Sequence, residues 1–198
     1  LNVRIGATDF ANLFGIRRGY DINIYDIAVL RDCISDIINM FSRVENSFVI
    51  SGPVWEYFVG GDRVMKPQLR NTPFAGSYGK SGPMIRKKII DEYIDGLMHE
   101  TVLDKANGLW GKTTIHPSHI IPVQSLYSVT HEEYVDALSI LENNTGEIGV
   151  LKSNYENKMN EIKTHTNWAN KIMMRAKIYG VLNEGKIFTD LFPKQNEA

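Results

Sequence analysis

The sequence predicts an α/β fold with parallel strands, and three observations lead to this prediction. Short apolar runs alternate with amphipathic helical patterns along the chain, which is the order that parallel strands with crossover helices produce. Hydrophobic residues make up 43% and charged residues 23% of the sequence, as in ordinary globular domains. A chain of 198 residues is also long enough to bury a sizeable core.

The first part of the chain predicts a strand, a helix and a second strand. The run from Asn2 to Gly6 favours a strand, and Phe48 to Ile50 favours the next one. Between these two strands, apolar residues recur at helical spacing at Ile27, Leu30, Ile34, Ile37 or Ile38, and Phe41. After the second strand, the stretch from Trp55 to Lys80 is rich in glycine, proline and arginine, and loops of this length are usually functional lids or disordered.

The second part predicts three further helices. Pro83 suits the first turn of a helix with an apolar stripe at Ile85, Ile89, Tyr93 and Leu97. Thr130 and Glu133 form a capping box that begins another helix. A last helix is expected from Asn167 to Leu182, with Gly185 ending it and one apolar face formed by Trp168, Ile172, Ala176 and Tyr179.

The most informative stretch lies between these helices and runs from Gly111 to His119. Its β-branched residues, Thr113 to Ile115, favour an extended backbone. Pro117 offers no N–H to a sheet and restricts the residue before it, so the strand should end there. The stretch therefore predicts a brief buried strand that brings four polar side chains to one edge of a sheet: Lys112, His116, Ser118 and His119.

Charge and motif content exclude several classes of protein. A net charge of −1 gives no long-range attraction to nucleic acid or to an anionic membrane surface. The sequence has no apolar run of transmembrane length and no signal-peptide pattern. The single cysteine, Cys33, cannot form an internal disulfide, which favours a cytoplasmic protein. The sequence also contains no Walker motif, no dinucleotide-binding glycine fingerprint and no nucleophile elbow.

The Gly111–His119 stretch resembles a family signature. Gly-Lys-x-x-Ile-His-Pro closes the last barrel strand in the citrate lyase β-subunit-like lyases of the HpcH/HpaI aldolase superfamily. The approach to this strand is similar at Asp104 and Gly108, and so is the segment from Val129 to Tyr134 that follows it. Gly6 to Phe10 resembles the family's Gly-x-Glu-Asp-Leu loop, with Thr8 in place of the usual glutamate. Ile50 to Val54 fits the penultimate strand.

This resemblance implies a (β/α)8 TIM barrel of which the chain supplies the C-terminal part. The first strand corresponds to the sixth of the family, so the last three strands are expected in residues 1–142, followed by a helical extension in 143–198. The preceding strands normally supply an anion-binding arginine and a second metal-binding glutamate. An open sheet edge favours pairing, and superfamily members commonly form trimers. We therefore expect a homodimer or homotrimer, with the Asn157–His165 segment, including Lys163, reaching a neighbouring subunit.

Further residues resemble one branch of this superfamily. Asp9-Phe10 with Leu13 to Gly19, and Tyr155 to Glu161 with His165 and Trp168, are similar to the TIM-barrel lyases of bacterial tellurium-resistance stress operons. The resemblance to this branch implies a stress-linked biosynthetic step towards a nucleoside-like product.

Asp9 is the candidate metal ligand. In the family the equivalent aspartate holds a divalent metal, and a carboxylate at a strand end suits Mg²⁺. A metal at this position would chelate a keto acid and stabilise an enolate while a carbon–carbon bond breaks or forms. The alternative is that Asp9 caps the next turn through local backbone hydrogen bonds.

His116 and Lys112 are the candidate catalytic residues. His116 could act as a general acid or base, or it could fix the backbone at the strand end. Lys112 could neutralise an anionic substrate, or it could form a salt bridge. The roles of Ser118 and His119 stay open.

Arg17 and Arg18 are candidates for binding a substrate carboxylate or phosphate, with a solvated charge pair as the alternative. Gly52 and Pro53, at the end of the penultimate strand, are the other candidate substrate contacts. In the long loop, Lys66 to Arg70 could close over an anionic ligand.

The sequence thus predicts an Mg²⁺-dependent lyase of the aldol or Claisen type, acting on a small carboxylated substrate or its thioester. Activity is expected for the intact enzyme and is left open for this chain by itself. Two alternatives remain: a non-catalytic ligand-binding or assembly module, and a phosphosugar- or nucleotide-binding enzyme that relies on the arginines.

Overall fold

A computed structural model describes residues 1–46, 48–58, 95–146 and 149–192. They divide into two compact units, one formed by residues 1–126 with Phe192 and the other by residues 127–191. The sequence places the domain boundary at residue 142, whereas α7 (His131–Glu142) packs with α8 (Ile162–Tyr179) in the second unit. Among the described residues, no helix combines the length and apolar character that a membrane span requires.

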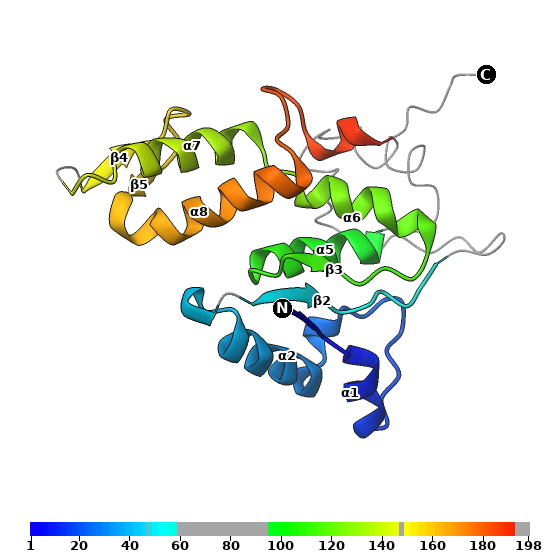
Figure 1. The fold of residues 1–198 in the computed structure, drawn as a ribbon. Coiled ribbons are helices and arrows are strands. Elements are labelled where there is room, and N and C mark those ends of the chain that lie inside the picture. The colour runs from blue at the N-terminus through cyan, green and yellow to red at the C-terminus, as the bar shows by residue number, and fades with distance from the viewer. Residues whose placement is uncertain (47, 59–94, 147–148, 193–198) are drawn as a thin grey trace, which may run out of the picture. The chain divides into compact units, whose positions relative to one another are not determined.

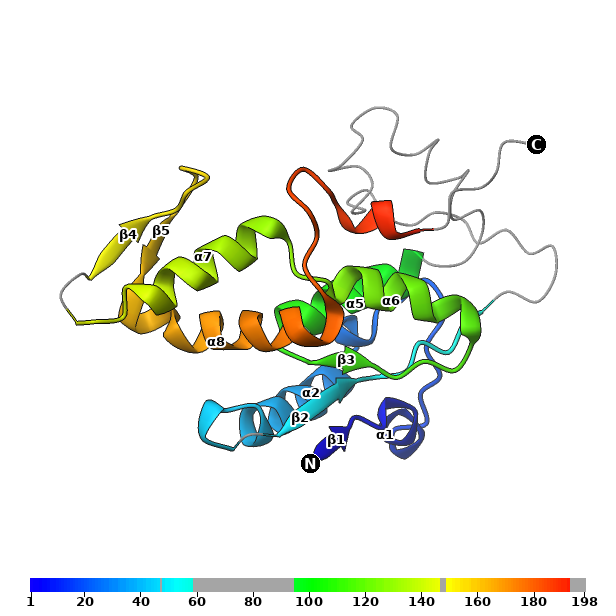
Figure 2. The ribbon, with the colours of Figure 1, turned by 45° about the horizontal axis from the view of Figure 1, so that its top comes forward.

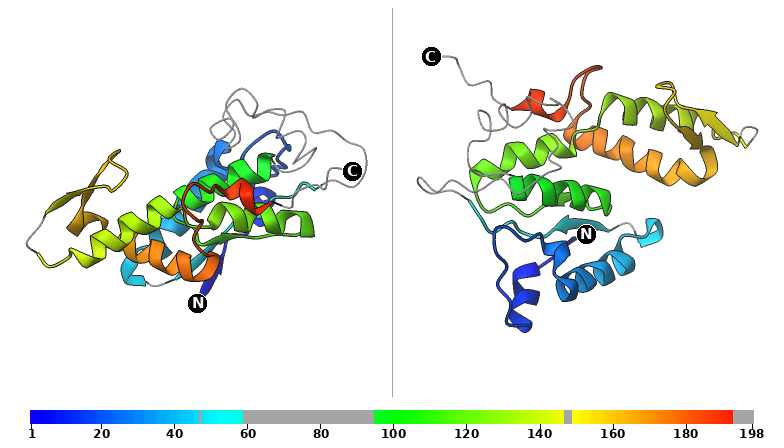
Figure 3. Two further views of the ribbon diagram at one scale, coloured as in Figure 1. Left: turned by 90° about the horizontal axis from the view of Figure 1, so that it is seen from above. Right: turned by 180° about the vertical axis from the view of Figure 1, so that it is seen from behind.

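Within the described residues, the first unit is built on a parallel sheet of three strands in the order β1-β2-β3. Its strands are β1 (Asn2–Arg4), β2 (Val49–Gly52) and β3 (Gly111–Lys112), with Val3 opposite Ile50 and Gly52 opposite Lys112. Figure 1 and, from behind, Figure 3 show α1 (Ala7–Leu13) and α2 (Ala28–Phe41) near β1 and β2, and α5 (Asp95–Ala106) beside β3. This arrangement confirms the predicted α/β class; that the strands are the last three of eight stays a prediction.

The core of the first unit fills the space between the sheet and α1 and α2. The predicted periodicity of α2 is confirmed, because Leu30 and Ile34 are buried while Asp32 and Asp36 are exposed. The buried core residues are Ile5, Ala7, Ala11, Ile24, Leu30, Ile34, Ile50 and Leu109. Short helical turns, η1 (Ile24–Asp26) and η2 (Val44–Asn46), precede and follow α2.

The predicted strand through Ile115 is wrong, because β3 ends at Lys112. The Thr113 amide donates the next hydrogen bond, to the Gly52 carbonyl at 3.1 Å, and Thr114 and Ile115 are exposed. β2 also ends at Gly52, so β-branched residues beyond this point have no strand beside them, and propensity alone does not extend the sheet. The chain then enters η4 (Pro117–His119) and α6 (Ile120–Tyr127).

In the second unit α7 packs against α8, and the segment that connects the two helices forms an antiparallel hairpin, as Figure 2 shows. The hairpin consists of β4 (Val150–Lys152) and β5 (Met159–Glu161). The predicted capping box is confirmed: Thr130 accepts from the Glu133 amide, and Glu133 accepts from the Thr130 amide. The shared core comprises Val129, Ala137, Ile140, Ile162, Ala169 and Ile172. A last turn, η5 (Phe188–Leu191), follows.

The predicted limits of the last helix are wrong at both ends. α8 begins at Ile162, and Gly180 ends it with a φ of 80°, a left-handed conformation that glycine adopts at low cost. The face predicted for contacts between chains is largely used within the unit, because Ile172 and Ala176 pack into the core shared with α7. The predicted helix from Pro83 and the loop residues Lys66 to Arg70 lie outside the described residues, except that Leu97 is buried in α5.

Candidate active site

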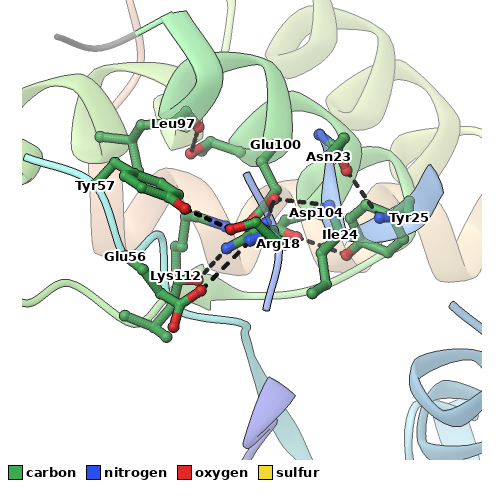
Figure 4. Close-up of polar contacts among 12 residues, drawn as sticks. Arg18, Asn23, Ile24, Tyr25, Glu56, Tyr57, Leu97, Glu100, Asp104 and Lys112 are labelled. Atoms are coloured by element: carbon green, nitrogen blue, oxygen red, sulfur yellow. Dashed lines mark hydrogen bonds and ion pairs between the residues drawn. The ribbon is translucent and has the colours of Figure 1, made fainter. Parts of the chain in front are cut away.

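Four charged side chains form a buried cluster at the carboxyl ends of β2 and β3 (Figure 4). Lys112, the last residue of β3, places its Nζ 2.8 Å from Glu100 Oε1 and 2.8 Å from Asp104 Oδ2. Arg18 donates from Nη1 to Glu100 Oε2. None of the four is more than 9% exposed, and their formal charges cancel. Parallel α/β folds build their sites at this end of the strands.

The two carboxylates reach the cluster because of their spacing on α5. Glu100 and Asp104 are four residues apart and therefore lie on one face of the helix, with Thr101 buried beside them. Gly52 makes room for this face. A Cβ on Gly52 would lie 2.5 Å from Asp104 Oδ2 and 3.1 Å from the Gly111 carbonyl oxygen.

Asp104 also accepts a hydrogen bond from the Tyr25 hydroxyl at 2.6 Å. Burial raises the pKa of this carboxyl group from 3.8 to about 6, because loss of water disfavours the charged form. The Lys112 ammonium acts in the opposite direction, and the Glu100 carboxylate adds to the rise.

Arg18 is held on several sides by the segment that follows β2. Its Nη2 donates to the Val54 carbonyl at 2.8 Å, and its guanidinium lies over the Trp55 ring, 4.9 Å from the centroid. Tyr57 donates its hydroxyl hydrogen to the Arg18 carbonyl. Within the described residues Arg18 Nε has no hydrogen-bond partner, and it lies 3.7 Å from Glu56 Oε2. Glu56 is half-buried and accepts from the Thr8 hydroxyl at 3.2 Å.

The two histidines of the predicted motif lie beside this segment. His116 Nδ1 accepts from the Ser118 amide at 3.3 Å and lies 2.8 Å from Ser118 Oγ, while its ring stacks on Phe58 with centroids 4.7 Å apart. The amide contact assigns the proton of neutral His116 to Nε2. His119 is buried, and its Nε2 lies 3.2 Å from the Tyr57 carbonyl oxygen. Burial lowers the pKa of His119, because loss of water disfavours the charged imidazolium.

Asp9 lies near the carboxyl end of β1, in the first turn of α1 rather than in a loop. Its carboxylate folds back over Gly6, where an added Cβ would be 2.7 Å from Oδ2. The side chain is exposed, and the N-cap residue of the helix is Gly6, which supplies no side-chain cap hydrogen bond. Among the described residues, no group of three or more His, Cys, Asp or Glu side chains could hold a metal. A lone carboxylate still fits Mg²⁺, which keeps several water ligands.

The remaining predicted residues are divided between the two units. Arg17 is exposed, whereas its neighbour Arg18 is buried, so the two guanidinium groups do not form an exposed pair. Pro53 is buried directly after β2. In the second unit, His165 Nδ1 accepts from the Glu161 amide at 3.1 Å at the start of α8, and Lys163 is exposed.

Sequence reasoning missed the two carboxylates that organise the cluster. Asp104 entered only as part of the family resemblance, and Glu100 received no role. The available signal was the pair of acidic residues four apart in the stretch before Gly111. This signal is weak, because such pairs are common on solvated helix faces.

Comparison with known proteins identifies a family. A family model described as C–C bond lyase of the TIM-barrel fold matches residues 1–181. No curated protein and no solved structure matches the sequence. The matched range includes all three parallel strands, Asp9 and the buried cluster. The chain therefore belongs to the C–C bond lyase family of the TIM-barrel fold.

Proposed function

We propose that this lyase is Mg²⁺-dependent and acts by aldol or Claisen chemistry on a small carboxylated substrate or its thioester. We also propose that the chain belongs to the citrate lyase β-subunit-like superfamily and to its stress-operon branch, and that it forms a homo-oligomer. The observation that carries it is Asp9, an exposed carboxylate near the carboxyl end of β1 in a chain of this lyase family. Bound Mg²⁺ would supply charge stabilisation for an enolate.

Three side chains of the protein would supply proton transfer, substrate binding and support of the site. His116 would serve as a general acid, since its Nε2 carries the proton of the neutral ring while Nδ1 accepts from the Ser118 amide. Arg17, which is exposed, would bind the substrate carboxylate. Lys112 would act through the buried cluster, because its ammonium is bonded to two protein carboxylates.

Replacing Asp9 by asparagine tests the proposal. Asp9→Asn keeps size but removes the negative charge of a proposed direct ligand. We expect Mg²⁺ affinity measured by calorimetry to fall at least about 10-fold, since even the loss of a group that only orients a ligand typically costs about 10- to 100-fold. Magnesium-dependent exchange of the pyruvate methyl protons in D₂O, followed by NMR, should fall with it. Asp26→Asn, another exposed acidic residue next to a helix start, serves as the control. Equal Mg²⁺ affinities of wild type and Asp9→Asn would contradict the proposal.

A second candidate function is a non-catalytic ligand-binding module. The observation that favours it is the internal pairing of Arg18 and Lys112, whose side chains are 2% and 0% exposed. Under this alternative the protein would bind oxalate, a dianion that mimics pyruvate enolate, without catalysing exchange. The same pairing argues against a phosphosugar- or nucleotide-binding enzyme that uses Arg18 as a direct substrate contact, because the Arg18 side chain is buried against Glu100.

A further inference from the structure

Glu100 is the residue that links the predicted site residues to one another. Its Oε1 accepts from Lys112 Nζ at 2.8 Å, and its Oε2 accepts from Arg18 Nη1 and from the Ile24 amide at 3.2 Å. These three donors come from β3, from the segment after α1 and from η1. One side chain with no solvent exposure thus fixes two cations and a backbone turn, as Figure 4 shows.

Stability alone is a weak explanation for this arrangement. Replacing buried ion pairs by well-packed apolar residues is often neutral or stabilising, whereas removing one partner costs several kcal/mol. A fold that only needed to fill this space would therefore gain little from two buried cations and two buried carboxylates. The cluster also lies at the carboxyl ends of β2 and β3, the end of the strands where chemistry is placed in this fold.

We propose that Glu100 is a positioning residue for the lyase site. By holding Arg18, it fixes the segment Val54–Tyr57, which contacts the guanidinium through the Val54 carbonyl and the Trp55 ring and binds the Arg18 carbonyl through the Tyr57 hydroxyl. By holding Lys112, it fixes the end of β3, from which the chain continues to His116. The carboxylate thereby sets the relative placement of both sides of the site without touching the substrate.

Asp104 supports this role from the next turn of α5. It shares Lys112 with Glu100 and is itself bonded by Tyr25. With both carboxylates ionised, the cluster of four is neutral. Loss of the Glu100 charge leaves two buried cations with one buried carboxylate, so Arg18 and Lys112 should both move from their present positions.

Glu100→Gln tests the inference, because glutamine preserves the shape and removes the charge. This inference rests on the proposed function for its activity readout. We expect oxalate affinity with Mg²⁺, measured by calorimetry, and pyruvate proton exchange to fall about 10- to 100-fold, the usual effect of losing a group that orients a site. Glu100→Asp, which retains the charge, should recover part of the exchange rate.

Asp136→Asn is the matched control. Asp136 is equally buried but lies in the second unit, where Ser153 and Asn160 donate to it. This variant should lose thermal stability while oxalate affinity and exchange stay within about twofold of wild type. A folded Glu100→Gln protein with wild-type affinity and exchange would overturn the inference. Equal losses in Glu100→Gln and Asp136→Asn would also overturn it, since they would show a general effect of stability.

Failure of the proposed function can be told apart from failure of this inference. Wild-type protein that neither binds oxalate nor exchanges pyruvate protons would contradict the function only. The inference is then tested by ¹⁵N NMR of the Lys112 ammonium and the Arg18 Nε–H group, which need no substrate. Glu100→Gln should shift both signals and Asp136→Asn neither; a shift of one signal alone, or of none, would overturn the inference. If Glu100→Gln fails to fold, the same NMR measurements on Glu100→Asp test the inference. We then expect smaller shifts of both the Lys112 and the Arg18 signals.

Discussion

At the scale of single residues, burial of Asp104 between Lys112 and Tyr25 determines how its carboxyl group responds to pH. Its pKa is raised from 3.8 to about 6. Between pH values of about 4 and 6 the folded protein therefore keeps a proton that the unfolded chain has released. The folded state binds more protons in this range, so this group's contribution to stability falls as the pH rises.

Asp104→Asn removes this titration. We expect the free energy of unfolding of wild type, minus that of the variant, to decrease as the pH rises from about 4 to 6 and to level off above about 7. Urea unfolding at four pH values measures this difference. A ¹³C NMR titration of the Asp104 carboxyl carbon should give a midpoint near 6, and a midpoint near 4 would contradict the prediction.

Gly52 is required for the close approach of Asp104 to β2. Gly52→Ala places a Cβ 2.5 Å from Asp104 Oδ2 and 3.1 Å from the Gly111 carbonyl, and both neighbours are held in place by other bonds. We expect a loss of about 1–3 kcal/mol in unfolding free energy, the usual cost of overpacking. Gly149→Ala, which meets nothing within 4 Å, should change it by less than about 0.5 kcal/mol. Similar effects in urea unfolding would remove the steric explanation.

At the scale of elements, α7 shows how much a local signal can determine. Thr130 and Glu133 satisfy two amide groups at the start of the helix by reciprocal hydrogen bonds, as the capping box in the sequence predicts. α5 is the opposite case. Part of its buried face consists of Glu100, Thr101 and Asp104, so apolar periodicity does not reveal which side of this helix is covered.

Thr130→Ala should destabilise α7 by about 1 kcal/mol, because the Glu133 amide loses its acceptor. Urea unfolding followed by circular dichroism measures the change. Thr114→Ala is the control, since Thr114 is exposed and lies outside the helices and strands; its effect should stay below about 0.5 kcal/mol. Equal effects of the two substitutions would show that the cap adds nothing to the stability of α7.

At the scale of the whole molecule, the described residues have two separate cores. Ile34 belongs to the core of the first unit and Ile140 to that of the second, and both side chains are fully buried. Because each core is made of residues from its own unit, damage to one core should be felt mainly by that unit.

Ile140→Ala should cost about 2–5 kcal/mol in the second unit by leaving a cavity. In hydrogen exchange followed by mass spectrometry, peptides from α7 and α8 should lose protection while peptides from β1, β2 and α2 keep theirs. Ile34→Ala should give the reverse pattern. A uniform loss of protection across the chain in either variant would show that the two units unfold as one.

The sequence by itself determined the features that depend on residues close together in the chain. The α/β class, the helix over Ala28–Phe41 and the capped start of α7 follow from periodicity and from side chains three or four residues apart. The lyase family could also be recognised from short motifs, because these preserve residue type and spacing, and the family match over residues 1–181 agrees.

Only the tertiary structure decided where β3 ends and what Lys112 and Arg18 contact. Strand length depends on the neighbouring strand, and β2 offers no partner beyond Gly52. The bond from Arg18 to Glu100 joins residues 82 positions apart, and that from Lys112 to Glu100 spans 12. Such contacts leave no periodic trace in the sequence, because they exist only when the sheet and α5 pack together and water is excluded from the charges.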